Sequence, residues 1–155
     1  TNSGLIDNVE IWIDGSLEFE DTYDGDLSAY TPYGSPSSQI GVNGNPGSSL
    51  MTSGDSCDPS GVYSNQTFTW GGTEWLIRAD FRISTATHFH DAIIGVRNGT
   101  KSMPCGGTGP IWNVDTVWCS IGGGDHTFRF GTDLDTMVIS DPGVAMWHTV
   151  EMFNY

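Results

Sequence analysis

The clearest pattern in this chain is a strict alternation of apolar and polar positions. Between residues 73 and 84 the apolar side chains recur at every second position, and they are Trp75, Ile77, Ala79, Phe81 and Ile83. Near the start of the chain, Val9, Ile11 and Ile13 alternate with polar residues and Trp12 in the same way. Period-2 alternation predicts strands with one face on a core, as in antiparallel sheets.

Shorter extended segments follow along the rest of the chain. The predicted strands are residues 17–20, 39–42, 49–51, 61–70, 92–97, 111–120, 126–130, 136–140 and 146–153. The remainder of residues 28–60 is rich in Gly, Pro, Ser, Asn and Thr and is predicted to be loop or sheet edge. With 21 Gly and 7 Pro among 155 residues, long helices are not expected. The pattern predicts one all-β domain over residues 1–155, an antiparallel β-sandwich or jelly roll.

Charge excludes several classes of partner. The chain has 5 Lys and Arg against 19 Asp and Glu, which gives a formal net charge of −14. Nucleic-acid binding is not expected, because phosphate contacts need clustered basic residues. Membrane insertion is not expected either, because no apolar window reaches the length of a membrane span. The chain begins with Thr1 rather than Met, which predicts a mature or excised chain.

Four segments carry a resemblance to a known family. They are Glu-Phe-Glu-Asp-Thr-Tyr-Asp-Gly-Asp-Leu-Ser at residues 18–28, Ser-Leu-Met-Thr-Ser-Gly-Asp-Ser at 49–56, Ser-Gly-Val-Tyr-Ser at 60–64 and Trp-His-Thr-Val-Glu at 147–151. Together they resemble the laminin G-like, concanavalin A-like jelly-roll domains of microbial surface proteins. The resemblance implies a concanavalin A-like jelly roll and an extracellular or cell-surface location.

The order of the segments departs from that family. Gly-Leu-Ile-Asp-Asn-Val-Glu-Ile at residues 4–11 is similar to the closing strand of those domains, yet here it comes first. Three explanations remain open: a module cut from a tandem array, a circular permutation, or a subunit that passes residues 1–15 to a neighbour. In the third, Leu5, Val9, Ile11 and Ile13 would complete the neighbour's sheet by strand addition. Repetition of that contact would give a filament of copies of this chain.

No pattern typical of an active site is present. Glycosidases need two carboxylates that flank one bond, and the alternating carboxylate triplet of jelly-roll glycosidases is missing from this sequence. The Gly-x-Ser-x-Gly motif of serine hydrolases and the His-Glu-x-x-His motif of zinc peptidases are missing as well. The chain is therefore expected not to be an enzyme.

An acidic segment is the best candidate for a metal site. Glu20, Asp21, Asp24 and Asp26 lie within seven residues, and Ca²⁺ prefers such oxygen ligands. Asp7 and Asn8 could join them if the first strand packs alongside. The alternative is an acidic turn solvated on a generally acidic surface.

Histidines offer a second metal hypothesis. His88 and His90 alternate on one side of a predicted extended segment, as in small zinc or copper sites. The simpler interpretation is a pair of partly exposed histidines at a sheet edge.

Aromatic residues suggest a carbohydrate site. Trp112, Asn113, Asp115 and Trp118 combine rings with hydrogen-bonding groups. The same spacing is also typical of core, because residues 112, 114, 116 and 118 share a face. Tyr30, Tyr33 and Trp12 are the other aromatic residues that could be exposed.

Cysteines and sequons fit a chain outside the cell. A disulfide between Cys105 and Cys119 would close a short loop, which leaves Cys57 as a buried thiol or a link between chains. Asn65 and Asn98 begin N-glycosylation sequons.

The sequence thus predicts a non-catalytic extracellular surface module, structural or adhesive, that assembles into a filament by strand exchange. The alternative is a lectin-like, carbohydrate-binding module of a larger secreted protein.

Overall fold

The computed structural model describes residues 3–33, 39–41, 44–53, 61–69, 74–83, 92–97, 116–122, 127–132, 136–140 and 146–154. Every regular element in these ranges is a strand. The strands are β1 (Ser3–Ile13), β2 (Ser16–Asp21), β3 (Tyr30–Tyr33), β4 (Gln39–Gly41), β5 (Ser49–Ser53), β6 (Gly61–Ser64), β7 (Trp75–Ile83), β8 (Ala92–Arg97), β9 (Thr116–Gly122), β10 (Thr127–Thr132), β11 (Thr136–Ser140) and β12 (His148–Asn154). The predicted all-β fold class is confirmed for this part of the chain.

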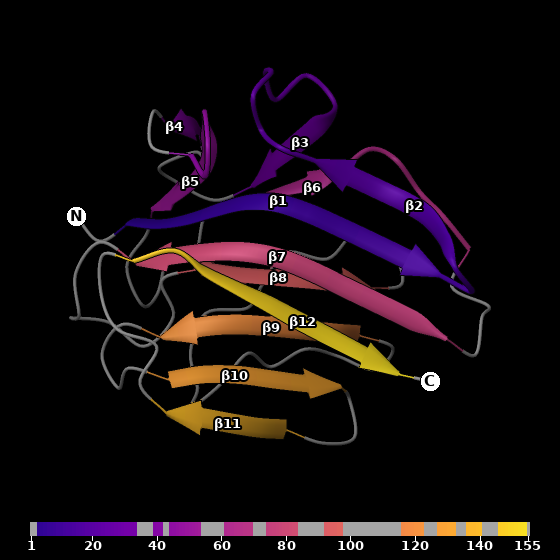
Figure 1. The fold of residues 1–155 in the computed structure, drawn as a ribbon. Helices are drawn as coiled ribbons and strands as arrows, with labels where there is room; N and C mark the ends of the chain where they lie inside the picture. The colour runs from indigo at the N-terminus through magenta and orange to yellow at the C-terminus, as the bar shows by residue number, and fades with distance from the viewer. Residues whose placement is uncertain are drawn as a thin grey trace.

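The strands form three antiparallel sheets. The largest has six strands in the order β12-β7-β1-β5-β4, with β2 also paired to β1. A four-stranded sheet has the order β11-β10-β9-β8, and β3 pairs with β6. In Figure 1, β8 lies behind β7. β8 contacts both β1 and β7.

β1 is the central strand of the six-stranded sheet. It pairs with β7 along nearly its whole length on one side. On the other side its first half pairs with β5 and its second half with β2. The two-residue turn from β1 to β2 has positive φ at both Asp14 (47°) and Gly15 (78°), the backbone shape of a type I′ hairpin.

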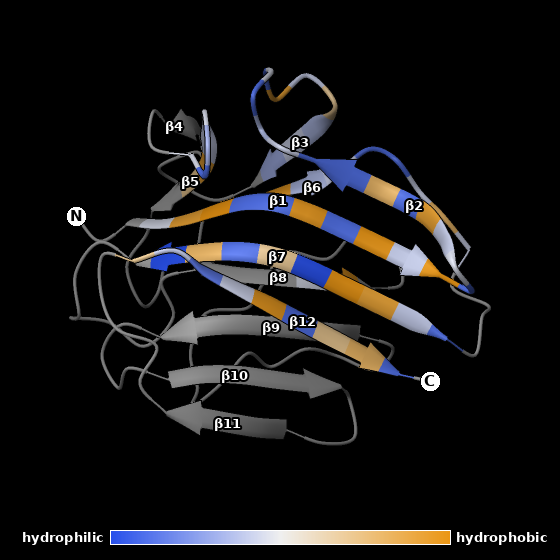
Figure 2. Ribbon diagram, viewed as in Figure 1, coloured by the Kyte–Doolittle hydropathy of each residue, from blue (hydrophilic) through white to orange (hydrophobic). Residues whose placement is uncertain are grey.

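One face of this sheet covers the apolar core. Cross-strand pairs such as Ile6 with Phe81 and Ile11 with Ile77 are buried. Figure 2 shows the alternation of hydrophobic and hydrophilic residues along β1 and β7. We call the opposite side of the six-stranded sheet its outer face.

Strand boundaries differ in part from the sequence-based prediction, because the strand predicted over residues 61–70 ends at Ser64 as β6. The predicted strand at 73–84 is confirmed as β7, and residues 136–140 form β11 as predicted. β3 was not predicted, because Tyr30–Tyr33 contains a proline inside a segment rich in turn residues. Its pairing with β6 supplies the partner that the local pattern could not reveal.

β1 departs from a regular strand at one point. Asp7 is opposite Asp80 and Glu10 is opposite Arg78, so β1 has one residue more than β7 between these two pairs. Asn8, with a φ of 47°, lies in this bulge. Asn tolerates the left-handed region better than most residues, and a bulge there changes which side chains face outward.

Candidate binding face on the six-stranded sheet

Apolar side chains form a row across the outer face. The strand registers align Phe153 of β12 with Leu76 of β7, Leu76 with Trp12 of β1, and Trp12 with Leu17 of β2. Phe153 is 53% exposed and Leu17 is 41% exposed, while Leu76 and Trp12 are half-buried. We call these four residues the apolar row. Large apolar side chains that gather on a surface mark a candidate interaction site.

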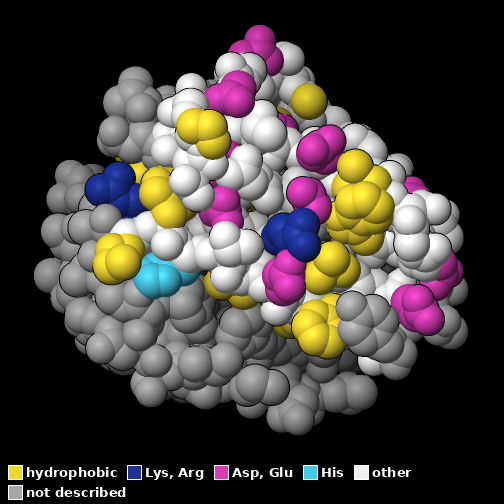
Figure 3. All heavy atoms as spheres, viewed as in Figure 1, with side chains coloured by type: hydrophobic (Ala, Val, Ile, Leu, Met, Phe, Trp, Pro, Cys, Tyr) yellow, Lys and Arg dark blue, Asp and Glu magenta, His cyan; other side chains and the backbone are white. Residues whose placement is uncertain are grey.

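A charged row runs beside the apolar row. Register places Glu151 opposite Arg78 and Arg78 opposite Glu10. The Arg78 Nε donates to Glu151 Oε1 at 2.7 Å and Nη2 lies 2.6 Å from the same oxygen, while Nη1 lies 3.2 Å from Glu10 Oε2. Hydrogen bonding to Glu151 and the nearby carboxylate charges raise the pKa of Arg78. We call Glu10, Arg78 and Glu151 the charged row; Figure 3 shows a basic side chain between acidic ones, with hydrophobic side chains beside them.

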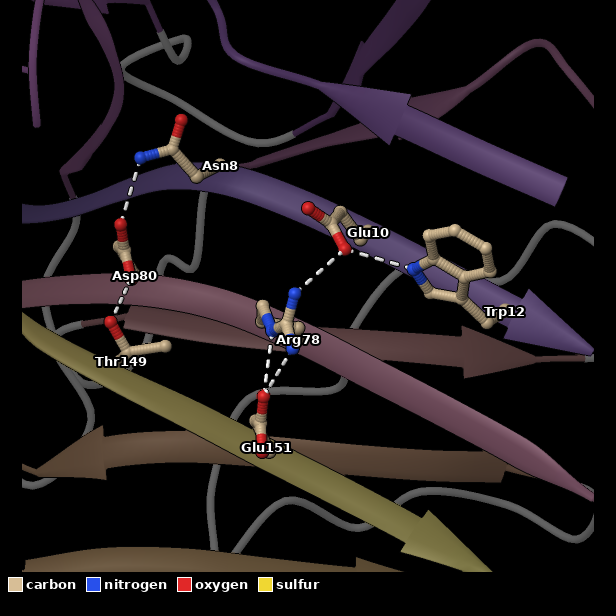
Figure 4. A network of polar contacts seen from close by, with 7 residues as sticks. All are labelled: Asn8, Glu10, Trp12, Arg78, Asp80, Thr149 and Glu151. Atoms are coloured by element: carbon tan, nitrogen blue, oxygen red, sulfur yellow. Dashed lines mark hydrogen bonds and ion pairs between the residues drawn. The ribbon is translucent and has the colours of Figure 1, made fainter. Parts of the chain in front are cut away.

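The two rows are linked through Trp12. Its indole Nε1 donates to Glu10 Oε2 at 2.8 Å, and this is the same oxygen that faces Arg78 (Figure 4). Glu10 therefore holds both the ring of Trp12 and the guanidinium of Arg78. Among the described residues these contacts use Glu10 Oε2 and Glu151 Oε1, so Glu10 Oε1 and Glu151 Oε2 are open acceptors.

A buried polar cluster lies further along the same face. Asp7 is fully buried and Asp80 is 6% exposed, although they are directly opposite each other on β1 and β7. Asp80 Oδ2 accepts from Asn8 Nδ2 at 2.8 Å and Asn45 Nδ2 at 3.1 Å, and Oδ1 accepts from Thr149 Oγ1 at 2.5 Å. Such bonds offset part of the cost of burying two like charges.

The cluster is closed by residues 44–48. Asn45 N donates to Asp7 Oδ2 at 2.5 Å and Ser48 N donates to Asp24 Oδ1 at 2.9 Å. Burial raises the pKa of Asp7; the hydrogen bonds from Asn45 and Asn8 oppose that shift, and the charges of Asp24 and Asp80 add to it. Every carboxylate oxygen of Asp7 and Asp80 has a donor within the protein, so the cluster is arranged as structural support for the loop.

Three of the four acidic residues predicted to bind calcium accept hydrogen bonds from separate donors. Asp21 accepts from Tyr23 N and from the Tyr30 hydroxyl, Asp24 accepts from Ser48 N, and Asp26 accepts from Ser28 N at 2.9 Å. Glu20 lies on β2 opposite Glu10. Within the described ranges, no group of three His, Cys, Asp or Glu residues is arranged to hold a metal. The calcium site remains a prediction.

Tyr30, one of the aromatic residues considered for carbohydrate binding, is part of the core. It is 8% exposed, and its ring centroid lies 5.9 Å from that of Tyr23. Burial raises the pKa of both hydroxyls, which keeps them neutral at all ordinary pH values. The side chain of Tyr33 lies outside the described part.

Most other predicted site residues lie outside the described residues. These are Trp112, Asn113, Asp115, Cys57, Cys105, His88, His90 and Asn98. For Trp118 and Cys119 the structure describes only the backbone, on β9 opposite Gly95 and Ile94. Asn65 is exposed, and its Oδ1 accepts from Thr31 Oγ1 at 2.5 Å.

The predicted strand-exchange residues lie on β1. Val9, Ile11 and Ile13 are buried in the core. Leu5 is also buried, and in the strand register it is opposite Met51 of β5 and Arg82 of β7. In the structure these residues pair with strands of their own chain. The exchange between copies stays a prediction, because the same pairings can form within one chain or between two.

Sequence reasoning missed the rows and the buried cluster. The alternation at 73–84 does place Leu76, Arg78 and Asp80 on one face, and that was the available signal. Their neighbours on β1 and β12 depend on strand register, which no local pattern specifies.

No protein-family model, curated protein or solved structure matches this chain. Among the described residues, no helix is long and apolar enough to cross a membrane.

Proposed function

We propose that the chain is a non-catalytic, extracellular surface module, structural or adhesive, whose copies assemble by exchange of β1. In this proposal the sheets form a jelly-roll sandwich, and contact of β8 with β1 and β7 supports that arrangement. The observation that carries the proposal is the position of β1 in the sheet order. It is the central strand of the largest sheet, yet its partners β5 and β7 are distant in the sequence.

The core depends on β1. Ile6 and Val9 belong to one buried cluster, and Ile11 and Ile13 belong to a second. A chain whose own β1 is displaced would expose the apolar partners of these residues to water, and it would leave two rows of backbone hydrogen-bonding groups without their strand partners. A β1 from another copy restores the same pairs, so exchange needs no new interface chemistry.

Only one local connection must open for the exchange. The turn at Asp14 and Gly15 joins β1 to β2. Opening it would let β1 reach a neighbour, while β2, whose strand partner among the described residues is β1, stays in place through the packing of Phe19 on the core until another β1 pairs with it. The difference in free energy between the closed and exchanged forms then lies in this turn, in the entropy of assembly and in the electrostatic repulsion between the acidic copies.

Negative-stain microscopy and size analysis of the full chain test the proposal. Filaments, or a ladder of oligomers that grows with protein concentration, are expected. A well-folded species that stays near 17 kDa (the chain mass is 16.7 kDa) across the concentration range would overturn strand exchange.

A further inference from the structure

We infer that the apolar row and the charged row together form a carbohydrate-binding site for a neutral polysaccharide chain. The site lies on the outer face of the six-stranded sheet and uses residues of β12, β7, β1 and β2. It does not depend on whether β1 is supplied by the same chain or by a neighbour, because the exchanged sheet has the same registers.

The apolar row provides a platform for the C–H faces of sugar rings. Phe153 is 53% exposed and Trp12 is half-buried, so each ring presents part of its surface to solvent. Neighbouring strands lie about 4.8 Å apart, so four strands span about 14 Å. That length fits a short run of sugar units rather than one monosaccharide.

The charged row provides hydrogen bonds for hydroxyl groups. Glu10 Oε1 and Glu151 Oε2 are open acceptors among the described residues, and Arg78 retains N–H groups beyond those directed at the two carboxylates. Sugar hydroxyls both donate and accept, so they can satisfy both kinds of group. An apolar protein surface pressed onto this face would bury them unsatisfied, at a cost for each group.

Charge excludes acidic polysaccharides as ligands. The site has two carboxylates around one guanidinium, with Glu20 on the adjoining strand, on a chain of net charge −14. Uronic-acid and sulfated polymers would be repelled. With acidic chains excluded, the apolar row and the hydrogen-bonding groups together favour a neutral chain rich in hydroxyl groups.

The site is also held in place before a ligand arrives. Arg78 bridges Glu10 and Glu151, and the indole of Trp12 is fixed by its bond to Glu10 (Figure 4). Ordering side chains on binding lowers affinity, so prior ordering of this kind favours binding.

Calorimetric titration of the full chain with cellohexaose and mannohexaose tests the inference, with hexagalacturonic acid as the acidic comparison. Binding of at least one neutral hexasaccharide is expected, with none of the acidic one. Phe153→Ser and Trp12→Leu should each weaken binding about fivefold or more, whereas Trp12→Phe should retain more of it than Trp12→Leu. Met146→Ser is the matched control, because Met146 is apolar and 61% exposed but lies outside both rows.

Circular dichroism and unfolding curves identify any variant that fails to fold. Phe153 is exposed, so the Phe153→Ser variant is expected to fold. It therefore tests the site even if the Trp12→Leu variant is unstable. The inference is overturned if no neutral hexasaccharide binds at millimolar concentration or if Phe153→Ser binds like wild type. It is also overturned if sedimentation shows a dimer that Phe153→Ser and Leu17→Ser abolish, because a second copy would then cover the face.

Discussion

At the scale of single residues, the Asp7 and Asp80 pair is the least expected feature of the structure. Two buried carboxylates lie opposite each other on adjacent strands, an arrangement that would be destabilising without compensation. Asn8 and Asn45 provide the compensation by donating to both carboxylates. The pair thereby fastens the loop at residues 44–48 to the middle of the sheet.

The two aspartates should respond differently to amide substitution. Asp80→Asn can still accept from the amides of Asn8 and Asn45 and can donate to Thr149 Oγ1, so the free energy of unfolding should change by less than about 1 kcal/mol. Asp7→Asn turns an N–H group toward the backbone N–H of Asn8 or Asn45, and should lower that free energy by about 1–3 kcal/mol. Urea unfolding of both variants at neutral pH measures the difference; equal effects would contradict this account.

The same pair predicts a pH dependence. The folded pKa of Asp7 is raised above the ordinary value of 3.8, so the folded state binds more protons in the interval above pH 3.8. The Asp7 contribution to the free energy of unfolding therefore falls as pH rises through this interval. Asp80→Asn removes one charge that raises this pKa, so the fall should be smaller in the variant. Unfolding curves of wild type and variant between pH 3.5 and about 7 make the comparison; an identical pH profile would count against it.

Gly47 is a second residue whose substitution should lower stability. Its φ is +89°, and a Cβ there would lie 2.2 Å from Asp24 Oδ1. Gly47→Ala should lower the free energy of unfolding by about 1–3 kcal/mol, through backbone strain and displacement of Asp24. Gly25→Ala is the matched control, because a Cβ at Gly25 meets nothing within 4 Å. Thermal melting should give a lower melting temperature for Gly47→Ala than for Gly25→Ala. Equal melting temperatures would contradict the close approach of Gly47 to Asp24.

At the scale of elements, the alternation of apolar and polar residues predicted where strands form better than it predicted which strands pair and in which register. β7 and the second half of β1 follow directly from the period-2 pattern. The bulge at Asn8 could not be predicted, because its cause is the contact of Asp7 and Asn8 with Asp80 and Asn45 from distant segments. The apolar row was missed for a similar reason: Trp12, Leu76 and Phe153 meet only through the register of three strands.

The β1–β2 turn offers a test of exchange at this scale. Asn-Gly favours a type I′ turn more strongly than most sequences, and Asp14→Asn keeps an oxygen for the bond from Glu74 N. This variant should shift the population toward the closed monomer. Gly15→Val places a β-branched residue at a φ of 78°, so it should open the turn and increase the oligomer fraction.

Analytical ultracentrifugation at matched concentrations compares the two turn variants with wild type. Circular dichroism shows whether Gly15→Val remains folded, and Asp14→Asn gives an independent answer if it does not. Identical oligomer distributions in all three proteins would argue against exchange of β1 through this turn.

At the scale of the whole molecule, net charge opposes any assembly of copies. Each copy carries −14, and repulsion between exposed charges extends over a Debye length of about 10 Å at 0.1 M salt. Asp24, Asp26 and Glu20 are exposed, so they add to repulsion wherever two such surfaces approach. Assembly by strand exchange therefore has to overcome an electrostatic cost that salt reduces.

Two salts at matched ionic strength distinguish screening from bridging. NaCl should raise the assembled fraction by screening alone. CaCl₂ should raise it further, because Ca²⁺ can bridge exposed carboxylates of neighbouring copies, and a chelator should reverse only that additional part. Light scattering and thermal melting report both effects. If chelation changes neither the assembled fraction nor the melting temperature, calcium has no part in the assembly. If NaCl also leaves the assembled fraction unchanged, electrostatic repulsion between copies is not what opposes assembly.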